Sequence, residues 1–395
     1  MLASVFTKPK QKKLFKKMAK TVENNNQGFI DDLMGFDPTQ VAAFNEPEQK
    51  SNTNQNLYKT NPLKVDAKTA PDGHYHAKVR IVYNPHDMKQ SIVNNAHYAM
   101  TDSDGFFMVD SKLAFQDRNC FMFKAWKQLH FDESPEKITV DGKQYTKKEW
   151  GDHMFDKSEE RFCLVQVIED ANQPELVGHF LGWRLPKAIF DTLQAKMHPT
   201  DKTKAPQDLM NYLFGPVLEL DVTPGPDDPQ HPERKQREIK YTLSSFESDP
   251  TPIISVTGEN LFTDDERDMI SDYAAAKKVL TDAKATAKKK DDAMAKCKEL
   301  IEPLKSLMQK AMDYVKENAI NIVDEFGYHE PSEALRKRAE KWIDIVVNKL
   351  ANPQTYVEPA EGSEVSEGNG KEKKTSKKEA PAVEMPENPT DDLPF

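Results

Sequence analysis

The chain has 395 residues, of which 30% are charged and 37% hydrophobic, with a mean hydropathy of −0.76 and a net charge of −10. This length allows two or three domains, and the polar composition indicates that part of the chain is tail or linker. The sequence has no apolar run of about 18 residues, which argues against a membrane span, and its apolar N-terminal stretch is too short for a signal peptide. The three cysteines lie far apart, which argues against a disulfide framework. Together these features predict a soluble cytoplasmic protein.

Residues 1–60 are predicted to form a basic arm followed by a polar linker. A short basic helix is expected over residues 10–18, and a second short helix over 29–34 or 39–44. The first twenty residues contain no acidic residue and seven lysines: Lys8, Lys10, Lys12, Lys13, Lys16, Lys17 and Lys20. A basic end on an acidic chain predicts contact with a polyanion.

Residues 61–255 carry the period-two pattern of half-buried strands. Tyr75, Ala77, Val79, Ile81 and Tyr83 stand at alternate positions, as in a strand with one face on a core. Further strands are expected over residues 105–109, 161–168, 176–183, 217–222 and 239–246, and a helix from just after Pro186 to Met197. Five or six short strands with one inserted helix predict a small antiparallel barrel or sandwich.

Residues 256–352 change to a helical period. Thr263 and Glu266 match a capping box, so a helix is expected to begin there. Pro303 is expected to divide the following residues, with a second helix from Pro303 to near Gly327 and a third over 331–350. Residues 353–395 have the composition of a disordered acidic tail. The predicted fold class is therefore α+β, with an antiparallel barrel, a C-terminal helical module and a tail.

The last twelve residues contain four acidic residues and no basic one. The tip consists of Asp391, Asp392, Leu393, Pro394 and Phe395, in which apolar side chains can fill a pocket while carboxylates meet basic residues on its rim. This tip is similar to the acidic tip of bacterial single-stranded DNA-binding proteins. The resemblance implies recruitment of replication and recombination proteins, such as a polymerase, a helicase or primase, and repair enzymes.

Residues 161–193 (RFCLVQVIEDANQPELVGHFLGWRLPKAIFDTL) resemble a segment of the T-even phage helix-destabilising protein family, in which two strands and a helix follow one another. Residues 77–85 resemble the first core strand of that family, and the basic N-terminal helix resembles its self-association arm. The resemblance implies an OB-fold core that coats single-stranded DNA cooperatively and without sequence preference. It also implies a phage-encoded protein acting in the cytoplasm of a bacterial host.

The family inserts a zinc module with one histidine and three cysteines into its barrel, and this chain departs from that pattern. Residues 94–130 keep His97 and Cys120 but contain no Cys-x-x-Cys pair, and a closed structural zinc site needs four ligands. We therefore predict no metal and no cofactor. The insertion is expected to be held by its own apolar side chains, namely Phe106, Phe107, Phe115, Phe121, Phe123 and Trp126.

Binding of single-stranded DNA needs exposed aromatic faces for base stacking and basic side chains for phosphates. The candidates are Trp183 with Arg184 and Lys187, Phe162 with Arg161, Tyr145 and Trp150 with Lys147 and Lys148, Tyr98, and Lys78 with Arg80. Core packing is the commoner role for any single aromatic residue. Trp183, which precedes Arg184 at the end of a predicted strand, is the preferred stacking residue.

The sequence gives no sign of an enzyme, because its histidines and acidic pairs lack the spacing of a nucleophile with its base or of a metal site, and no phosphate-binding glycine loop is present. Two alternatives to single-stranded DNA binding remain open. One is an adaptor that uses its helical module and tip to link partner proteins. The other is binding of single-stranded RNA by the same barrel, because base stacking tolerates either sugar.

Overall fold

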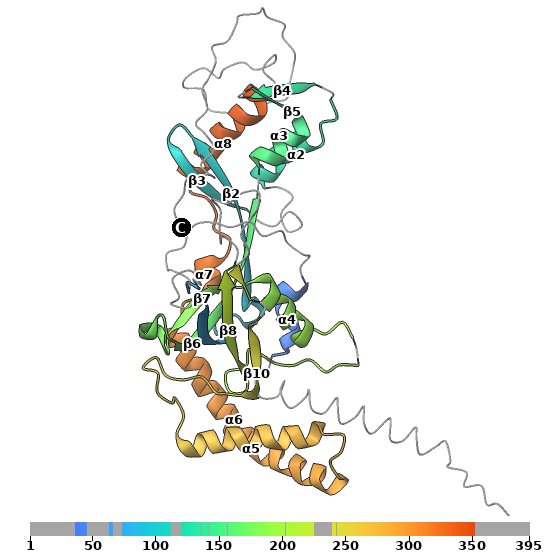
Figure 1. Cartoon of the computed structure of the whole chain (residues 1–395), viewed down its shortest axis with the longest axis vertical. Coiled ribbons are helices and arrows are strands. Elements are labelled where there is room, and N and C mark those ends of the chain that lie inside the picture. The colour runs from blue at the N-terminus through green and yellow to red at the C-terminus, as the bar shows by residue number, and fades with distance from the viewer. Residues whose placement is uncertain are drawn as a thin grey trace, which may run out of the picture. The chain divides into compact units, whose positions relative to one another are not determined.

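The computed structural model describes residues 36–45, 63–65, 73–111, 120–134, 136–140, 142–155, 157–201, 203–224, 239–241 and 243–351. The chain forms two compact units (Figure 1). Unit 1 takes its described residues from 1–49, 54–94 and 160–327, and unit 2 takes its described residues from 95–159 and 328–395. None of the helices in the described ranges has the length and apolar character that a membrane span requires.

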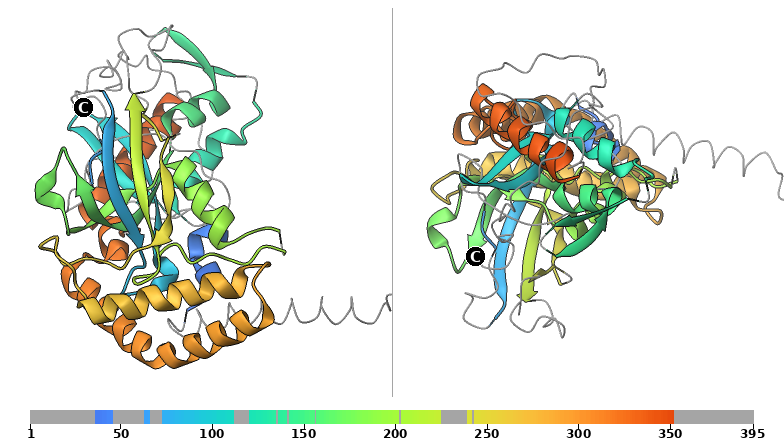
Figure 2. Two further views of the ribbon diagram at one scale, coloured as in Figure 1. Left: turned by 60° about the horizontal axis from the view of Figure 1, so that its bottom comes forward. Right: turned by 90° about the horizontal axis from the view of Figure 1, so that it is seen from above.

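Unit 1 is built on an antiparallel sheet. Its strands are β1 (Tyr75–Val82), β6 (Lys157–Asp170), β7 (Phe180–Arg184), β8 (Pro216–Pro224), β9 (Ile239–Lys240) and β10 (Ser245–Pro250), and β2 (Ile92–Asp102) begins in this unit. The strand order is β10-β8-β1-β6-β2-β3, where β3 (Gly105–Ser111) belongs to unit 2, and β7 pairs with β6 and β9 with β8. In Figure 2, β1 (blue) and β8 (yellow-green) lie side by side.

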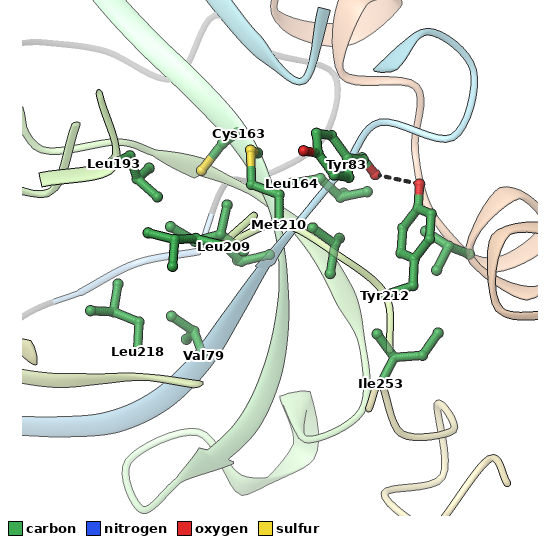
Figure 3. Close-up of a cluster of buried hydrophobic side chains, with 14 of the residues drawn as sticks. Val79, Tyr83, Cys163, Leu164, Leu193, Leu209, Met210, Tyr212, Leu218 and Ile253 are labelled. Carbon is green, nitrogen blue, oxygen red and sulfur yellow. Dashed lines mark hydrogen bonds between the residues drawn. The ribbon is translucent and has the colours of Figure 1, made fainter. Parts of the chain in front are cut away.

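The core of unit 1 covers one face of this sheet at the start of β1 and both faces farther along, where Val79 to Val82 are all buried. Tyr75, Ala77 and Val79 of β1 are buried, whereas His76 is exposed and Lys78 half-buried, as the period-two pattern predicts. Figure 3 shows part of this core, where Val79 and Leu218 from paired strands lie with other buried side chains. The Tyr212 hydroxyl donates a hydrogen bond to the Tyr83 carbonyl at 3.0 Å.

Helices complete unit 1. They are α4 (Lys187–Met197), α5 (Asp264–Thr281), α6 (Ala287–Asn318) and α7 (Ile322–Phe326), with 3₁₀ turns η1 (Pro38–Gln40), η2 (Ala42–Asn45), η3 (Met88–Gln90) and η4 (Pro174–Leu176). The predicted capping box is confirmed, because Thr263 and Glu266 exchange hydrogen bonds at the start of α5. The buried faces of α5 and α6 belong to the same core as the sheet.

The predicted division at Pro303 is wrong, because α6 runs through this residue without interruption. Pro303 is exposed, while Leu300 and Leu304 on either side are buried. Water can therefore satisfy the carbonyl that loses its partner, and apolar packing holds both halves of the helix in line. The helix instead begins at the Thr286 cap, whose hydroxyl accepts from Lys289 N–H.

Unit 2 has its own core. Its elements are the end of β2, β3 (Gly105–Ser111), α2 (Phe121–His130), β4 (Lys137–Val140), β5 (Lys143–Thr146), α3 (Lys147–Met154), the start of β6, α8 (Glu333–Ile343) and the π-helical η6 (Asp344–Leu350). Arg338 on α8 donates two hydrogen bonds to the Asp102 carboxylate at the end of β2, and this pairing lowers the pKa of Asp102. Trp342 Nε1 donates to the Thr101 carbonyl at 2.9 Å.

The mixed α+β class with an antiparallel sheet and several helices is confirmed, and no closed barrel is found among the described strands. The strands predicted at 75–83, 105–109, 161–168 and 217–222 are present. The one predicted over 176–183 begins later, at Phe180, and the one predicted over 239–246 is divided between β9 and β10. The helix at 10–18 and the tail lie outside the described residues.

The two units do not follow the predicted domain ranges of 61–255 and 256–352. Residues 264–326 pack on the sheet of unit 1, and α8 with η6 packs in the core of unit 2. The predicted helical module is thus shared between two cores. Its amphipathic pattern indicated that each helix buries one face, but it contained no information on which partner covers that face.

Candidate nucleic-acid interface

The structure buries four of the five aromatic residues that were predicted to stack on bases. Trp183 is 1% exposed, Phe162 is 1% exposed, and Trp150 and Tyr98 also lie in cores. Trp150 is held in unit 2 by a hydrogen bond from its Nε1 to the Val346 carbonyl at 3.1 Å. The expectation that these four rings offer free faces is wrong, since a base cannot stack on a ring already covered by protein.

Two of the predicted phosphate contacts are also buried. The Arg80 guanidinium lies fully inside unit 1, donates to the Asn211 carbonyl, and has its pKa lowered to about 9 by burial. Arg161 is buried with its guanidinium 3.9 Å from the centre of the Phe190 ring, a cation–π contact. Neither side chain can reach a phosphate on the surface.

The remaining basic candidates of unit 1 face carboxylates. Lys78 lies 3.2 Å from Glu247 and 3.8 Å from Glu169, and the hydrogen bond to Glu247 is the main cause of its raised pKa. Arg184 lies 3.0 Å from Glu160, and Lys187 is paired with a carboxylate one helical turn away on α4. The exposed face of β1 is therefore acidic overall, which disfavours a DNA backbone there.

In unit 2, Lys147 is a structural residue. Its side chain is 10% exposed, and its ammonium donates to the Asp132 carboxylate at 2.9 Å. The prediction that Lys147 contacts phosphates is therefore wrong. The Asp132 carboxylate also accepts from Ser134 N–H, and together these hydrogen bonds, that of Lys147 first, lower the pKa of Asp132 to about 2.

This lowered pKa predicts a loss of stability in acid. The folded pKa of Asp132 lies below its unfolded value of about 3.9, so its contribution is present above pH 4 and disappears as the pH falls from about 4 to about 2. Because the side chain is 30% exposed, we expect a loss of only about 1 kcal/mol. Urea midpoints measured from pH 2 to 7 should fall less steeply in Asp132→Asn. Equal slopes in both proteins would contradict the assignment.

Two predicted residues of unit 2 do remain at the surface. Lys148 is exposed, and the half-buried Tyr145 stacks on the exposed His153 with ring centres 5.7 Å apart and an interplanar angle of 9°. The capping box formed by Thr146 and Glu149 fixes the start of α3 beside them. The stacked rings of Tyr145 and His153 form one small aromatic surface.

A larger aromatic cluster reaches the surface on α2, and we call it the α2 ridge: the half-buried Phe123, Trp126 and His130, and the exposed Phe131. Phe123 and Trp126 are stacked with ring centres 5.4 Å apart, and Trp126 and His130 with centres 4.2 Å apart. Phe131, just after the helix, contacts His130 edge to face at 4.9 Å and is 63% exposed. The i, i+3 and i+4 spacing places the three helical rings on one side of α2, while Met122, Ala125 and Leu129 face the core.

A carboxylate from α3 fixes the middle of the α2 ridge. Asp152 Oδ1 accepts a hydrogen bond from Trp126 Nε1 at 2.9 Å and lies 2.7 Å from His130 Nδ1. The two helices come close at Gly151, where an added Cβ would lie 2.7 Å from the Leu129 Cβ. The rings are thus held in position before any ligand arrives, which lowers the entropic cost of binding.

Lysines flank these rings. Lys124 and Lys127 are exposed on α2, and Lys127 Nζ lies 6.0 Å from the centre of the Phe131 ring. Trp126 is stacked between Phe123 and His130, so the ring most open to a base is the exposed Phe131. An accessible ring with ammonium groups beside it matches what single-stranded nucleic acid requires, namely an aromatic face for a base and cations for phosphates.

Sequence reasoning placed Phe123 and Trp126 in the insertion as core residues and did not select the α2 ridge. The available signal was the segment FMFKAWKQLHF, in which aromatic residues and lysines alternate at helical spacing, but residues 121–130 were not predicted to be a helix. His97 lies in β2, and Cys120 lies 3.5 Å from the Ser111 hydroxyl. The basic arm and the acidic tip lie outside the described residues.

The sequence matches no protein-family model and no curated protein.

Proposed function

We propose that this chain binds single-stranded DNA without strong sequence preference and that bases stack on the α2 ridge. The observation that carries the proposal is the aromatic row of α2, in which Phe123, Trp126 and His130 are half-buried and Phe131 is exposed, with Lys124 and Lys127 beside it. Stacking on such rings contributes about 1–3 kcal/mol per base and does not depend on base identity.

We place the proposed binding surface on unit 2 and not on the sheet of unit 1. The sheet face that carries Lys78 is crowded with carboxylates, whereas the α2 ridge has lysines beside its rings. The net charge of −10 does not oppose this proposal, because the potential close to the binding surface governs the contact with phosphates.

The rest of the proposal rests on the sequence resemblance. The antiparallel sheet of unit 1 would be a divergent OB-fold-like core, the lysine-rich arm would promote cooperative coating, and the tip ending in Phe395 would recruit replication and recombination proteins. We propose no catalytic activity. Single-stranded RNA is the competing ligand, because stacking does not distinguish the sugars.

The most direct test is Phe131→Ala. Since this ring is 63% exposed, its removal should leave the fold intact and weaken binding of a single-site oligo-dT by about 1–3 kcal/mol, as measured by fluorescence titration. Lys127→Gln should weaken binding uniformly across sequences and reduce the slope of log affinity against log salt by about 1.

Leu243→Ala is the matched control, because Leu243 is a similarly exposed apolar residue, at 59%, in unit 1. It should bind oligo-dT like the wild type. Parallel titrations with oligo-rU and duplex DNA separate RNA binding and non-specific charge effects from the proposal. Wild-type affinity of Phe131→Ala for oligo-dT would refute stacking on the α2 ridge, and no binding of any nucleic acid by the wild type would favour the adaptor function.

A further inference from the structure

Two histidines and a carboxylate meet on the exposed face of the sheet in unit 1. His74 precedes β1, His76 lies within it, and Asp221 lies on the neighbouring strand β8. One ring nitrogen of each histidine and a carboxylate oxygen of Asp221 all lie within 4.8 Å of one another. This cluster plays no part in the proposed DNA-binding surface.

The fold brings the three side chains together through strand geometry. His74 and His76 are two residues apart and so point to the same side of the sheet, while Tyr75 between them is buried on the other side. His76 is the direct cross-strand partner of Asp221 in the antiparallel pairing of β1 with β8. The two imidazole rings are stacked with centres 5.7 Å apart and an interplanar angle of 10°.

The distances suit a small cation. Asp221 Oδ1 lies 3.3 Å from His74 Nδ1 and 3.9 Å from His76 Nδ1. Donor atoms in a tetrahedral shell with bonds of about 2.0–2.1 Å are separated by about 3.3–3.4 Å. Small side-chain adjustments would therefore bring these atoms into one coordination shell.

The surroundings also favour a cation. Glu219 lies two residues before Asp221 on the same strand and pairs with Lys78 in register, and Glu247 adds a further carboxylate next to Lys78. The backbone of Asp221 is fixed by Ser244, whose hydroxyl accepts from Asp221 N–H at 3.1 Å and lies 3.2 Å from the Asp221 carbonyl. These contacts fix the backbone from which the Asp221 carboxylate projects.

We propose that His74, His76 and Asp221 bind a divalent transition-metal ion of the zinc class. Imidazole nitrogen selects such ions over Mg²⁺ and Ca²⁺, which prefer all-oxygen shells. Three protein ligands leave at least one position of the shell to water. All three side chains are reachable from solvent, with His74 and His76 43% and 54% exposed, so the ion can enter without opening the fold.

The test is calorimetric titration of the chelator-treated full-length protein with Zn²⁺. We expect one site, and we expect His76→Ala and Asp221→Asn each to lower its Zn²⁺ affinity about tenfold or more. The loss of a ligand should lower the affinity at least as much as the loss of an outer-shell contact. Zn²⁺ should also raise the melting temperature of the wild type, since it binds only the folded arrangement, and that rise should vanish in both variants.

His86→Ala is the matched control, because His86 is an exposed histidine outside the cluster, and it should bind Zn²⁺ like the wild type. Circular dichroism of each variant shows that the fold is retained. Visible absorption of Co²⁺, used in place of Zn²⁺, reports the coordination geometry independently of affinity. The proposal is overturned if His76→Ala and Asp221→Asn bind Zn²⁺ as tightly as the wild type, or if His86→Ala weakens binding equally.

Discussion

Trp183→Ala is expected to lower the free energy of unfolding by about 3–5 kcal/mol. The indole is 1% exposed, pairs through its strand with Cys163, and meets the Tyr241 ring edge to face at 6.2 Å, so alanine leaves a large cavity in the core of unit 1. Urea unfolding followed by circular dichroism measures the loss. The affinity of the protein that remains folded for oligo-dT should not change.

Trp126→Ala is the contrasting variant. Its indole is half-buried on α2 and loses one hydrogen bond, to Asp152, so we expect a smaller loss of stability of about 1 kcal/mol together with weaker binding of oligo-dT. A stable Trp183→Ala with reduced DNA affinity would restore Trp183 as a stacking residue and count against the α2 ridge.

Local sequence signals predicted several elements of the fold correctly. The alternation from Tyr75 onward gave β1, and the capping box of Thr263 and Glu266 gave the first residue of α5. Both signals act within a few residues, so no knowledge of the tertiary fold is needed to use them. The break predicted at Pro303 is wrong because a proline destabilises a helix locally, whereas the packing of Leu300 and Leu304 that outweighs this effect involves distant parts of the chain.

The binding surface was harder to predict because exposure depends on tertiary contacts. Trp183 and Trp126 both stand near basic residues in the sequence, yet one is buried and the other lines a surface. Arg80 shows the same limit, since its place in a strand suggested a surface charge and the fold encloses it. The proposed metal site could not be predicted without the strand register, because Asp221 is 145 residues from His76 along the chain and directly opposite it in the sheet.

Gly182→Ala is expected to lower the free energy of unfolding by about 3 kcal/mol, the upper end for overpacking. A Cβ on Gly182 would overlap the ring of Phe326 at the end of α7. The Phe326 ring cannot easily move away from the new Cβ, because it stacks on Phe162 with centres 4.4 Å apart and an interplanar angle of 4°. Thermal or urea unfolding of the full-length protein measures the effect.

The double variant Gly182→Ala/Phe326→Leu tests the stated cause. Leucine is shorter than phenylalanine and leaves room for the new Cβ, so the loss of stability in the double variant should be smaller than the sum of the two single losses. Additive losses would mean that Gly182 is required for the backbone of β7 itself, and not for the approach of Phe326. In that case the contact between α7 and β7 would contribute less to unit 1 than the overlap implies.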